Sequence, residues 1–192
     1  MSMYALAILA VVVVIGFWAL TTFNGLVRRK NIVSEAWSGI EAQLKRRADL
    51  IPNLVETVKG YATHERTTFD ELARLRSQSQ GTQDIAQRAQ TEQAITAAIG
   101  KIMAVAEAYP QLRASDNFQS LQKDLAAIED EIQLSRRYYN GAVRDLNVMI
   151  EQAPSNLIAN WFAFKEAAFF QIENAADRAV FATHGFHAMS SM

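Results

Sequence analysis

The side chains that could perform chemistry in this sequence are few and scattered. Glu129, Asp130 and Glu131 form an acidic run, and paired carboxylates can act as general acid and base when a dry cleft holds them. Adjacent positions on a helix point in different directions, so the run is predicted to be a solvated face. The sequence contains no glycine-rich phosphate loop, nucleophile elbow or Ser/His/Asp arrangement. We therefore expect no catalytic residue.

The three histidines do not predict a metal site. His184 and His187 are spaced i, i+3, which could hold a metal ion if a helix and a third ligand were present, but an incidental pair is the simpler interpretation. His64 and Glu65 lack the second histidine of a zinc-protease helix. The absence of cysteine excludes disulfides, thiolate metal sites and thiol nucleophiles. No metal and no cofactor is expected.

A polar strip in the second half of the chain is the set of side chains best suited to recognition. Asn140, Arg144 and Asn147 fall on one helix face at i, i+4 and i+7. Asparagine amides beside an arginine can bridge neighbouring helices or hold the backbone of a partner, and bridging is the preferred interpretation. Asp49 and Asn53 could join them in one buried polar network, which requires every member to be paired. The whole strip comprises Arg137, Tyr138, Tyr139, Asn140, Arg144, Asp145 and Asn147.

The part of the chain that carries these side chains is expected to be attached to a membrane by an amino-terminal helix. Met3 to Leu20 is an apolar run of 18 residues without a charge. As a helix it covers roughly 27 Å, and the next residues, to Phe23, complete a hydrocarbon core of about 30 Å. We predict a retained anchor over residues 1–25, because a cleaved signal peptide would have a basic leader and a shorter apolar stretch. A buried core helix is the third possibility, but the run is apolar on every face.

The far end of the apolar run predicts a membrane boundary and an orientation. Trp18 and Phe23 are aromatic side chains suited to the water–membrane interface. Arg28, Arg29 and Lys30 follow, whereas only the terminal amine precedes the run. The positive-inside rule therefore predicts an amino terminus outside and a cytoplasmic body, with the lipid bilayer as the first partner.

The composition after the anchor predicts a single all-helical domain. Glycine and proline number only 8 and 3, and no alternating run rich in β-branched residues follows the anchor. Apolar stripes predict helices over residues 33–61, 67–105 (with a weak join at 77–81), 115–150 and, much shorter, 155–164. Three long segments joined by short turns must run up, down and up. We expect an antiparallel bundle over residues 26–165 that the fourth piece closes.

Single residues refine this outline. Pro52 lies inside the first stripe and removes a backbone donor there, so a kink or a short break is expected. Arg47 is the one residue that interrupts the apolar stripe around it. Ser115 and Ser155 are predicted helix caps. Residues 166–192 form an apolar tail that is expected to pack within the chain, the alternative being an exposed interface.

The formal charge of −1 hides a gradient along the chain. Residues 26–47 carry six basic and two acidic side chains, so the positive charge lies nearest the membrane. Anionic headgroups would attract such residues at roughly 1 kcal/mol each near the surface. Lys45, Arg46 and Arg47 beside aromatic residues could meet phosphates, but a nucleic-acid binder usually shows a basic face over the whole domain. No nucleic-acid partner is expected.

Several segments closely resemble the signature of the LemA family. The longest continuous one reads QLKRRADLIPNLV. The matching segments are residues 31–37, 43–55, 58–61, 107–112, 137–140, 143–147 and 154–159. The resemblance implies a bacterial protein with one amino-terminal membrane helix followed by an antiparallel helical bundle. It implies no established reaction and supplies no catalytic residue, and beyond Phe164 the sequence departs from the family pattern.

Together these observations predict a non-enzymatic, membrane-tethered bundle in the bacterial inner membrane. It would organise other membrane or cytoplasmic proteins, with a homo-oligomer as one form of that binding. The candidate residues for recognition or a polar network are Glu35, Trp37, Asp49, Asn53, Asn140, Arg144 and Asn147. One alternative is an enzyme, or a regulator of a membrane enzyme, with a polar pocket between helices near Pro52. A second is a membrane-shaping or lipid-surface-binding element.

Overall fold

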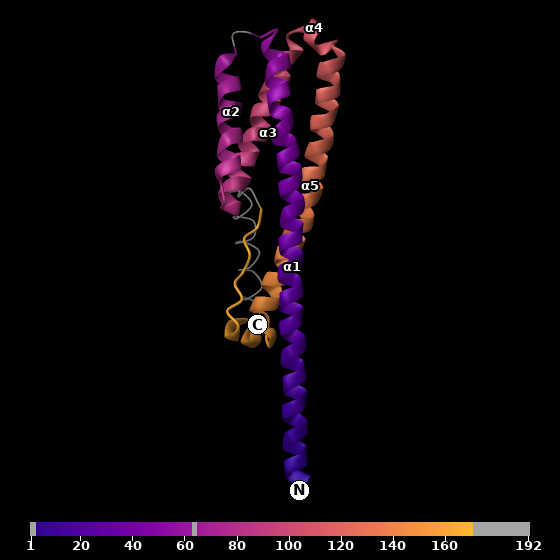
Figure 1. Cartoon of the computed structure of the whole chain (residues 1–192), viewed down its shortest axis with the longest axis vertical. Helices are drawn as coiled ribbons and strands as arrows, with labels where there is room; N and C mark the ends of the chain where they lie inside the picture. The colour runs from indigo at the N-terminus through magenta and orange to yellow at the C-terminus, as the bar shows by residue number, and fades with distance from the viewer. Residues whose placement is uncertain (1–2, 63–64, 171–192) are drawn as a thin grey trace, which may run out of the picture.

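The computed structural model describes residues 3–62 and 65–170, and every regular element in this part of the chain is an α-helix. In chain order the elements are α1 (Met3–Lys59), α2 (Arg66–Gly81), α3 (Ile85–Glu107), α4 (Pro110–Arg113), α5 (Asp116–Glu151) and α6 (Ser155–Trp161). The four long helices form a bundle, and the short helices α4 and α6 lie at its opposite ends (Figure 1). The predicted all-α fold is confirmed.

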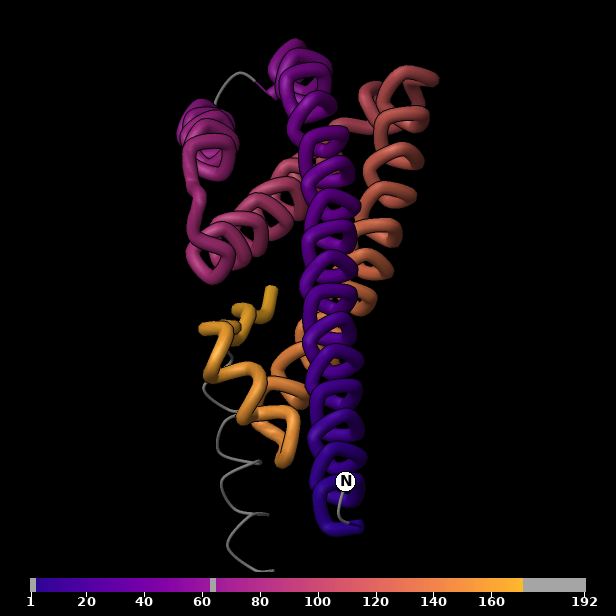
Figure 2. Tube along the Cα trace, turned by 60° about the horizontal axis from the view of Figure 1, so that its bottom comes forward, coloured from indigo at the N-terminus to yellow at the C-terminus, as the bar shows by residue number. Residues whose placement is uncertain are grey.

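Helices α1 and α5 are antiparallel partners over most of the length of the bundle (Figures 1 and 2). Ile40 and Leu44 of α1 share one buried cluster with Ile132, Tyr139 and Val143 of α5. Their spacing of four or seven residues keeps each set on one helix face. Because a fully buried aliphatic side chain contributes about 1.5–3 kcal/mol, these facing stripes are a main source of the pairing.

The middle of the chain forms a hairpin of two helices instead of one long helix. Helix α2 ends at Gly81, and Asp84 caps α3 by accepting a hydrogen bond from the Gln87 amide at 2.7 Å. The predicted weak join at 77–81 is helical, and the break follows it directly. The expected order of up, down and up is therefore wrong. One extra reversal makes α5 antiparallel to α1.

Pro52 does not interrupt α1, so the short break that the sequence allowed does not occur. The helix runs without interruption from Met3 to Lys59. A proline at position 52 leaves the Ala48 carbonyl without its usual donor four residues later. Arg76 of α2 supplies a replacement, donating from Nε to the Ala48 carbonyl oxygen at 2.7 Å. A tertiary contact thus satisfies the group that the proline leaves unpaired.

The predicted amino-terminal cap is confirmed for α5 and is wrong for α6. Ser115 caps α5 as predicted, its Oγ accepting from the Phe118 amide at 3.3 Å. Ser155 is not the cap of α6, because Pro154 occupies that position and the Ser155 hydroxyl donates to the Gln152 carbonyl at 2.8 Å. Proline at this position leaves the serine one residue too late to cap.

Beyond α6 the chain turns back along the bundle without regular structure (Figure 2). Ala163 makes the turn with a φ of 54°. Phe170 is then buried in the cluster that α1 and α5 share. The start of the predicted tail, residues 166–170, therefore packs within the chain, and the remainder of the tail lies outside the described residues.

The amino-terminal third of α1 projects from the bundle (Figure 1). It is the one described helix that is long and apolar enough to cross a membrane, and none of its most apolar 18-residue window is buried against the rest of the described chain. Among the described residues, this window is therefore not a core helix. This apolar helix suggests a single-pass membrane anchor.

Candidate functional site

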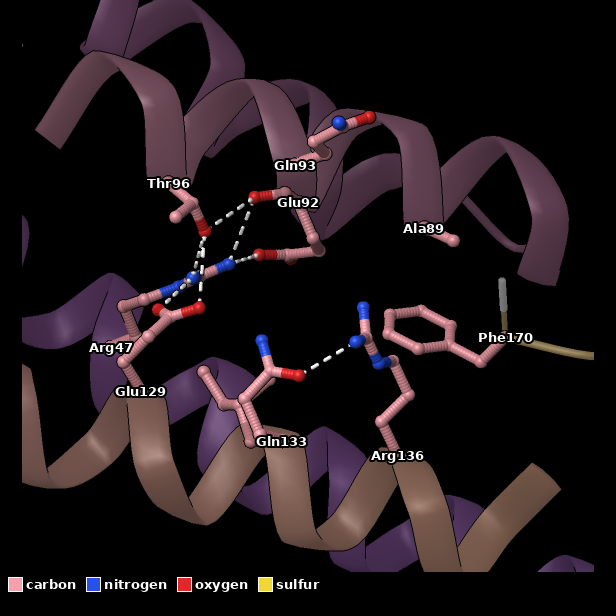
Figure 3. A pocket seen from close by; sticks show the side chains of 10 residues that line it. Arg47, Ala89, Glu92, Gln93, Thr96, Glu129, Gln133, Arg136 and Phe170 are labelled. Carbon is pink, nitrogen blue, oxygen red and sulfur yellow. Dashed lines mark hydrogen bonds and ion pairs between the residues drawn. The ribbon is translucent and has the colours of Figure 1, made fainter. Parts of the chain in front are cut away.

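A buried arginine joins the four long helices (Figure 3). Arg47 of α1 is only 2% exposed. Its Nη1 donates to Oε2 of Glu129 on α5 at 2.6 Å and to Oγ1 of Thr96 on α3 at 2.7 Å. Its Nη2 pairs with the carboxylate of Glu92 on α3, whose other oxygen accepts from the hydroxyl of Ser79 on α2. These five residues are named the Arg47 cluster.

The local sequence forces Arg47 inward and so requires partners for it. Position 47 follows Leu44 by three residues and precedes Ile51 by four, so it lies on the buried stripe of α1. An isolated charge there would cost several kcal/mol of desolvation. Glu92, itself 6% exposed, supplies the buried counter-charge, while the partly exposed Glu129 carboxylate keeps contact with solvent. The cluster thereby ties the α2–α3 hairpin to the α1–α5 pair.

This cluster was not predicted from the sequence. Arg47 interrupts an apolar stripe there, but its neighbours Lys45 and Arg46 favour a basic surface, and Glu129 stands in an acidic run that favours a solvated face. In the structure Lys45 and Arg46 are exposed, whereas Arg47 is buried and pairs with Glu129. A charged residue at a buried stripe position is itself the signal, because it demands a counter-charge at another stripe position, here Glu92.

Three cavities adjoin the Arg47 cluster. Cavities of about 90 and 240 Å³ lie between α3 and α5, the first beside Phe170 and the second beside Met103 and Leu125. A third of about 340 Å³ lies between α1 and the α2–α3 hairpin and includes Asp49. None of the three includes Pro52, where a polar pocket was predicted. Residues of the Arg47 cluster line all three cavities and supply part of their polar surface.

The hydrogen bonds of the cluster leave little capacity for a ligand. Each terminal nitrogen of Arg47 already donates twice, Nη1 to Thr96 and Glu129 and Nη2 to the carboxylate and backbone carbonyl of Glu92. Within residues 3–62 and 65–170, no three His, Cys, Asp or Glu side chains are grouped so that they could hold a metal ion. The hydrogen bonds of the Arg47 cluster therefore serve to position the four long helices relative to one another.

A second polar arrangement holds the extended segment that follows α6. The Asn147 side chain accepts from the Ala167 amide at 2.9 Å and donates to the Ala167 carbonyl at 3.0 Å. Asn140 makes the same two bonds with Phe170, at 2.9 and 3.2 Å. Between them, the Tyr139 hydroxyl donates to the Ala168 carbonyl at 2.8 Å. Asn140 and Asn147 are named the asparagine clamp.

The spacing of the clamp matches an extended backbone. Seven residues of α-helix rise about 10.5 Å, and three residues of extended chain cover about 10 Å. Two amides at i and i+7 on α5 therefore meet residues 170 and 167 in register, and they contact only backbone atoms. The asparagines hold backbone instead of bridging two helices, and the backbone belongs to this chain.

Comparison with known proteins identifies the family. The sequence model of the LemA family matches residues 36–183, which is well over half of the chain. The chain belongs to the LemA family. The match includes both the Arg47 cluster and the asparagine clamp, and it continues past Phe164, beyond which a departure from the family pattern was expected.

Several curated proteins have sequences related to this chain. Magnetosome protein MamQ 2 of Paramagnetospirillum magneticum is 25% identical over 202 residues, which cover 91% of this chain and 74% of that protein. Magnetosome protein MamQ of Magnetospirillum gryphiswaldense is 23% identical over 201 residues, with the same shares covered. Protein LemA of Metamycoplasma hominis is 27% identical over 149 residues, covering 77% of this chain and 68% of that protein.

In this LemA-family chain, the predicted recognition residue Trp37 lies against the extended segment. Its ring centroid is 5.5 Å from that of Tyr139 and 5.6 Å from that of Phe170. The Arg88 guanidinium covers the ring at 5.6 Å and also pairs with Glu41 at 2.8 Å. Trp37 is therefore already occupied by contacts within the chain.

The other predicted recognition residues do not gather around the clamp. The exposed ones are Glu35, Asp49, Asn53 and Arg144. Trp37 packs against Tyr139 and Arg47 against Glu129, so Asp49 and Asn53 lie further up α1 than the clamp. The predicted buried network of Asp49 and Asn53 with the polar strip is therefore wrong, because both side chains point to solvent.

The predicted membrane-interface residues of this LemA-family chain lie where α1 leaves the bundle. Trp18 is partly exposed, and Phe23 packs against Phe162 and Phe164. The basic residues that follow are exposed, namely Arg28, Arg29 and Lys30. The histidines considered as metal ligands, His64, His184 and His187, lie outside the described residues.

Proposed function

We propose that this protein is a non-enzymatic scaffold of the bacterial inner membrane, with its amino terminus outside and its bundle on the cytoplasmic side. It binds other membrane or cytoplasmic proteins and further copies of itself. The observation that carries this proposal is the continuity of α1, which is one uninterrupted helix from Met3 to Lys59. The proposed membrane span and the longest helix of the bundle are parts of the same helix. A partner bound to the bundle is therefore held at a fixed distance from the membrane and in a fixed orientation relative to it.

The outer face of α5 supports a binding role. Leu134, Tyr138 and Val148 are 52%, 60% and 48% exposed, although each is large and apolar. At about 100° of rotation per residue, the three side chains fall within about 80° of helix arc. Exposed apolar side chains gathered on one face of a helix are a feature of interaction surfaces. The exposed Asp145 lies within the same arc, so we assign the docking of partners to a strip of these three apolar side chains with one carboxylate among them.

The polar arrangements agree with a scaffold better than with an enzyme. Both terminal nitrogens of Arg47 donate within the fold, and the hydrogen bonds of the asparagine clamp are made to backbone atoms. The names of the relatives state no reaction.

Site-specific photo-crosslinking in intact cells tests the docking surface. Benzoylphenylalanine in place of Tyr138 should capture discrete products, among them one of twice the mass of the chain, because the strip faces partners. The same group at Gln78, an exposed polar position on α2, is the matched control and should capture little. A bare monomer from position 138, together with monomeric behaviour in mild detergent, would contradict the proposal.

The absence of cysteine allows the orientation to be tested separately. Ser2→Cys and Ser77→Cys variants can be treated on intact cells with a maleimide that does not cross the inner membrane. Labelling of Ser2→Cys alone is the expected result. Labelling of the body position alone would reverse the proposed orientation.

A further inference from the structure

The short helix α6 exposes the largest apolar side chains on the body of the molecule. Trp161 is 84% exposed, Leu157 65% and the adjoining Phe162 54%. Leu157 and Trp161 are four residues apart and so share one face of α6, whereas Ala159 on another face is fully buried. From Ser155 to Phe164 the sequence contains no charged residue. A helix of this kind is unusual on a water-facing surface.

The position of α6 along α1 is fixed by direct contacts. The ring of Phe162 lies 4.7 Å from that of Phe23, measured between centroids. Leu26, almost one turn further along α1, shares a buried cluster with Ala159 and Ile150. Figure 1 shows α6 crossing the lower end of the bundle beside α1, at the level where α1 leaves it. The exposed face of α6 is therefore level with Phe23.

That level coincides with the edge of a bilayer around the anchor. From Met3 to Phe23 a helix rises about 30 Å, which is the thickness of the hydrocarbon core. If α1 spans the membrane, the boundary between acyl chains and headgroups passes through the plane of α6. Tryptophan is the side chain that most favours this boundary, since its ring is apolar and its N–H needs a polar partner.

The charges around α6 suit headgroups on the side away from the acyl chains. Arg28, Arg29 and Lys30 are exposed on the next turns of α1, and Lys165 is exposed just after α6. Arg29 and Arg144, together with Asp145, also line an open groove of about 500 Å³ beside the start of α6. Glu166 is exposed next to Lys165. Basic groups outnumber acidic ones on the bundle side of the apolar face, as expected for a surface that meets anionic lipid.

We propose that α6 is a second membrane contact, which lies in the lipid interface with Leu157, Trp161 and Phe162 inserted at the top of the acyl region. This inference rests on the proposed anchor and adds a lateral contact to it. One transmembrane helix leaves the bundle free to tilt and rotate about the span. A second contact, held to α1 through the Phe23–Phe162 pair, fixes both.

Nitroxide labelling of single cysteines tests the inference in the full-length protein. The variants Val12→Cys, Trp161→Cys and Gln78→Cys are reconstituted in vesicles of phosphatidylcholine and phosphatidylglycerol, and collisions with oxygen and with a water-soluble nickel chelate are measured. Oxygen concentrates in acyl chains and the chelate in water. The ratio of oxygen to nickel accessibility should be roughly threefold or more higher at 161 than at 78, an exposed position on α2 that lies beside the Arg47 cluster, far above the boundary and outside the proposed docking strip.

The three positions separate the possible failures. A water-exposed label at Val12 overturns the anchor and the inference together. A lipid-exposed label at Val12 with a water-exposed label at 161 overturns the inference alone. A label at 161 that is shielded from both reagents identifies a protein partner or a second copy as the occupant, which also overturns it.

The native tryptophan gives a second measurement that does not replace Trp161. In a Trp18→Phe background, vesicles containing brominated lipid should quench a large part of the fluorescence, because Trp161 lies at the bromine depth while Trp37 lies within the bundle. The further change Trp161→Phe is the matched control and should abolish that quenching. Equal quenching with and without Trp161 would overturn the inference.

Discussion

Replacing Arg76 tests how α1 passes through Pro52. Arg76 donates a charge-assisted hydrogen bond of 2.7 Å to the partly buried Ala48 carbonyl, the group that a proline at position 52 leaves without a helical donor. Hydrogen bonds that involve a charged group contribute about 1.5–3 kcal/mol, and an unpaired buried carbonyl costs about 1–3 kcal/mol. Arg76→Met should therefore lower the free energy of unfolding by about 2 kcal/mol.

A double-mutant cycle with Pro52→Ala isolates the contact. Alanine restores an amide that can donate to Ala48, so Arg76→Met should cost less than about 1 kcal/mol in that background, a coupling of about 1 kcal/mol. The assay is urea unfolding in detergent, followed by the far-ultraviolet circular dichroism of the helices. Arg74→Met is the matched control, because Arg74 bonds only to the exposed Gln78 on its own helix. Equal losses from Arg76→Met in both backgrounds would refute the reasoning.

Three further predictions concern the Arg47 cluster, the asparagine clamp and Tyr139, which lies beside the clamp. Arg47→Met should cost about 3–5 kcal/mol in the same assay, since it leaves Glu92 buried without its counter-charge, whereas Arg46→Met on the exposed side should cost less than about 0.5 kcal/mol. Asn147→Ala should lower stability by about 1–2 kcal/mol and speed limited proteolysis of the segment that it holds; unchanged cleavage would argue against the clamp. Burial raises the pKa of the Tyr139 hydroxyl above its usual value of about 10, so the folded state keeps this proton longer than the unfolded chain. Stability should therefore fall as pH rises through that range and beyond, and Tyr139→Phe should reduce this alkaline loss in denaturation curves measured at several pH values.

Features encoded by residues near one another could be predicted from the sequence. The stripe of α5 and its Ser115 cap depend on contacts within a few residues, and the uncharged run before Phe23 needs only a count of length and polarity. The hairpin of α2 and α3 was harder to predict from the sequence. Asp84 is a good capping residue, but its signal was weaker than the apolar pattern that continues on either side of it.

Features that depend on distant partners were mispredicted or missed. Pro52 is a helix breaker by local rules, and the donor that keeps α1 intact comes from Arg76, 28 positions away from the carbonyl it reaches. Arg47 and Glu129 each resemble surface charge in their own segment, yet they are 82 positions apart and in contact. The asparagine periodicity was visible, but only the folded chain shows that an extended segment lies across it.

The length of α1 beyond the membrane has an electrostatic consequence. From Phe23 to Lys59 the helix rises about 54 Å, and α5 runs back along it, so the turn that contains α4 stands at a similar distance. The potential of a charged bilayer decays over a Debye length of about 8 Å at physiological salt. A partner that binds at the end of the bundle near α4 would therefore bind with equal affinity over neutral and anionic lipid. The affinity of a partner that binds near α6 would depend on the charge of the lipid headgroups.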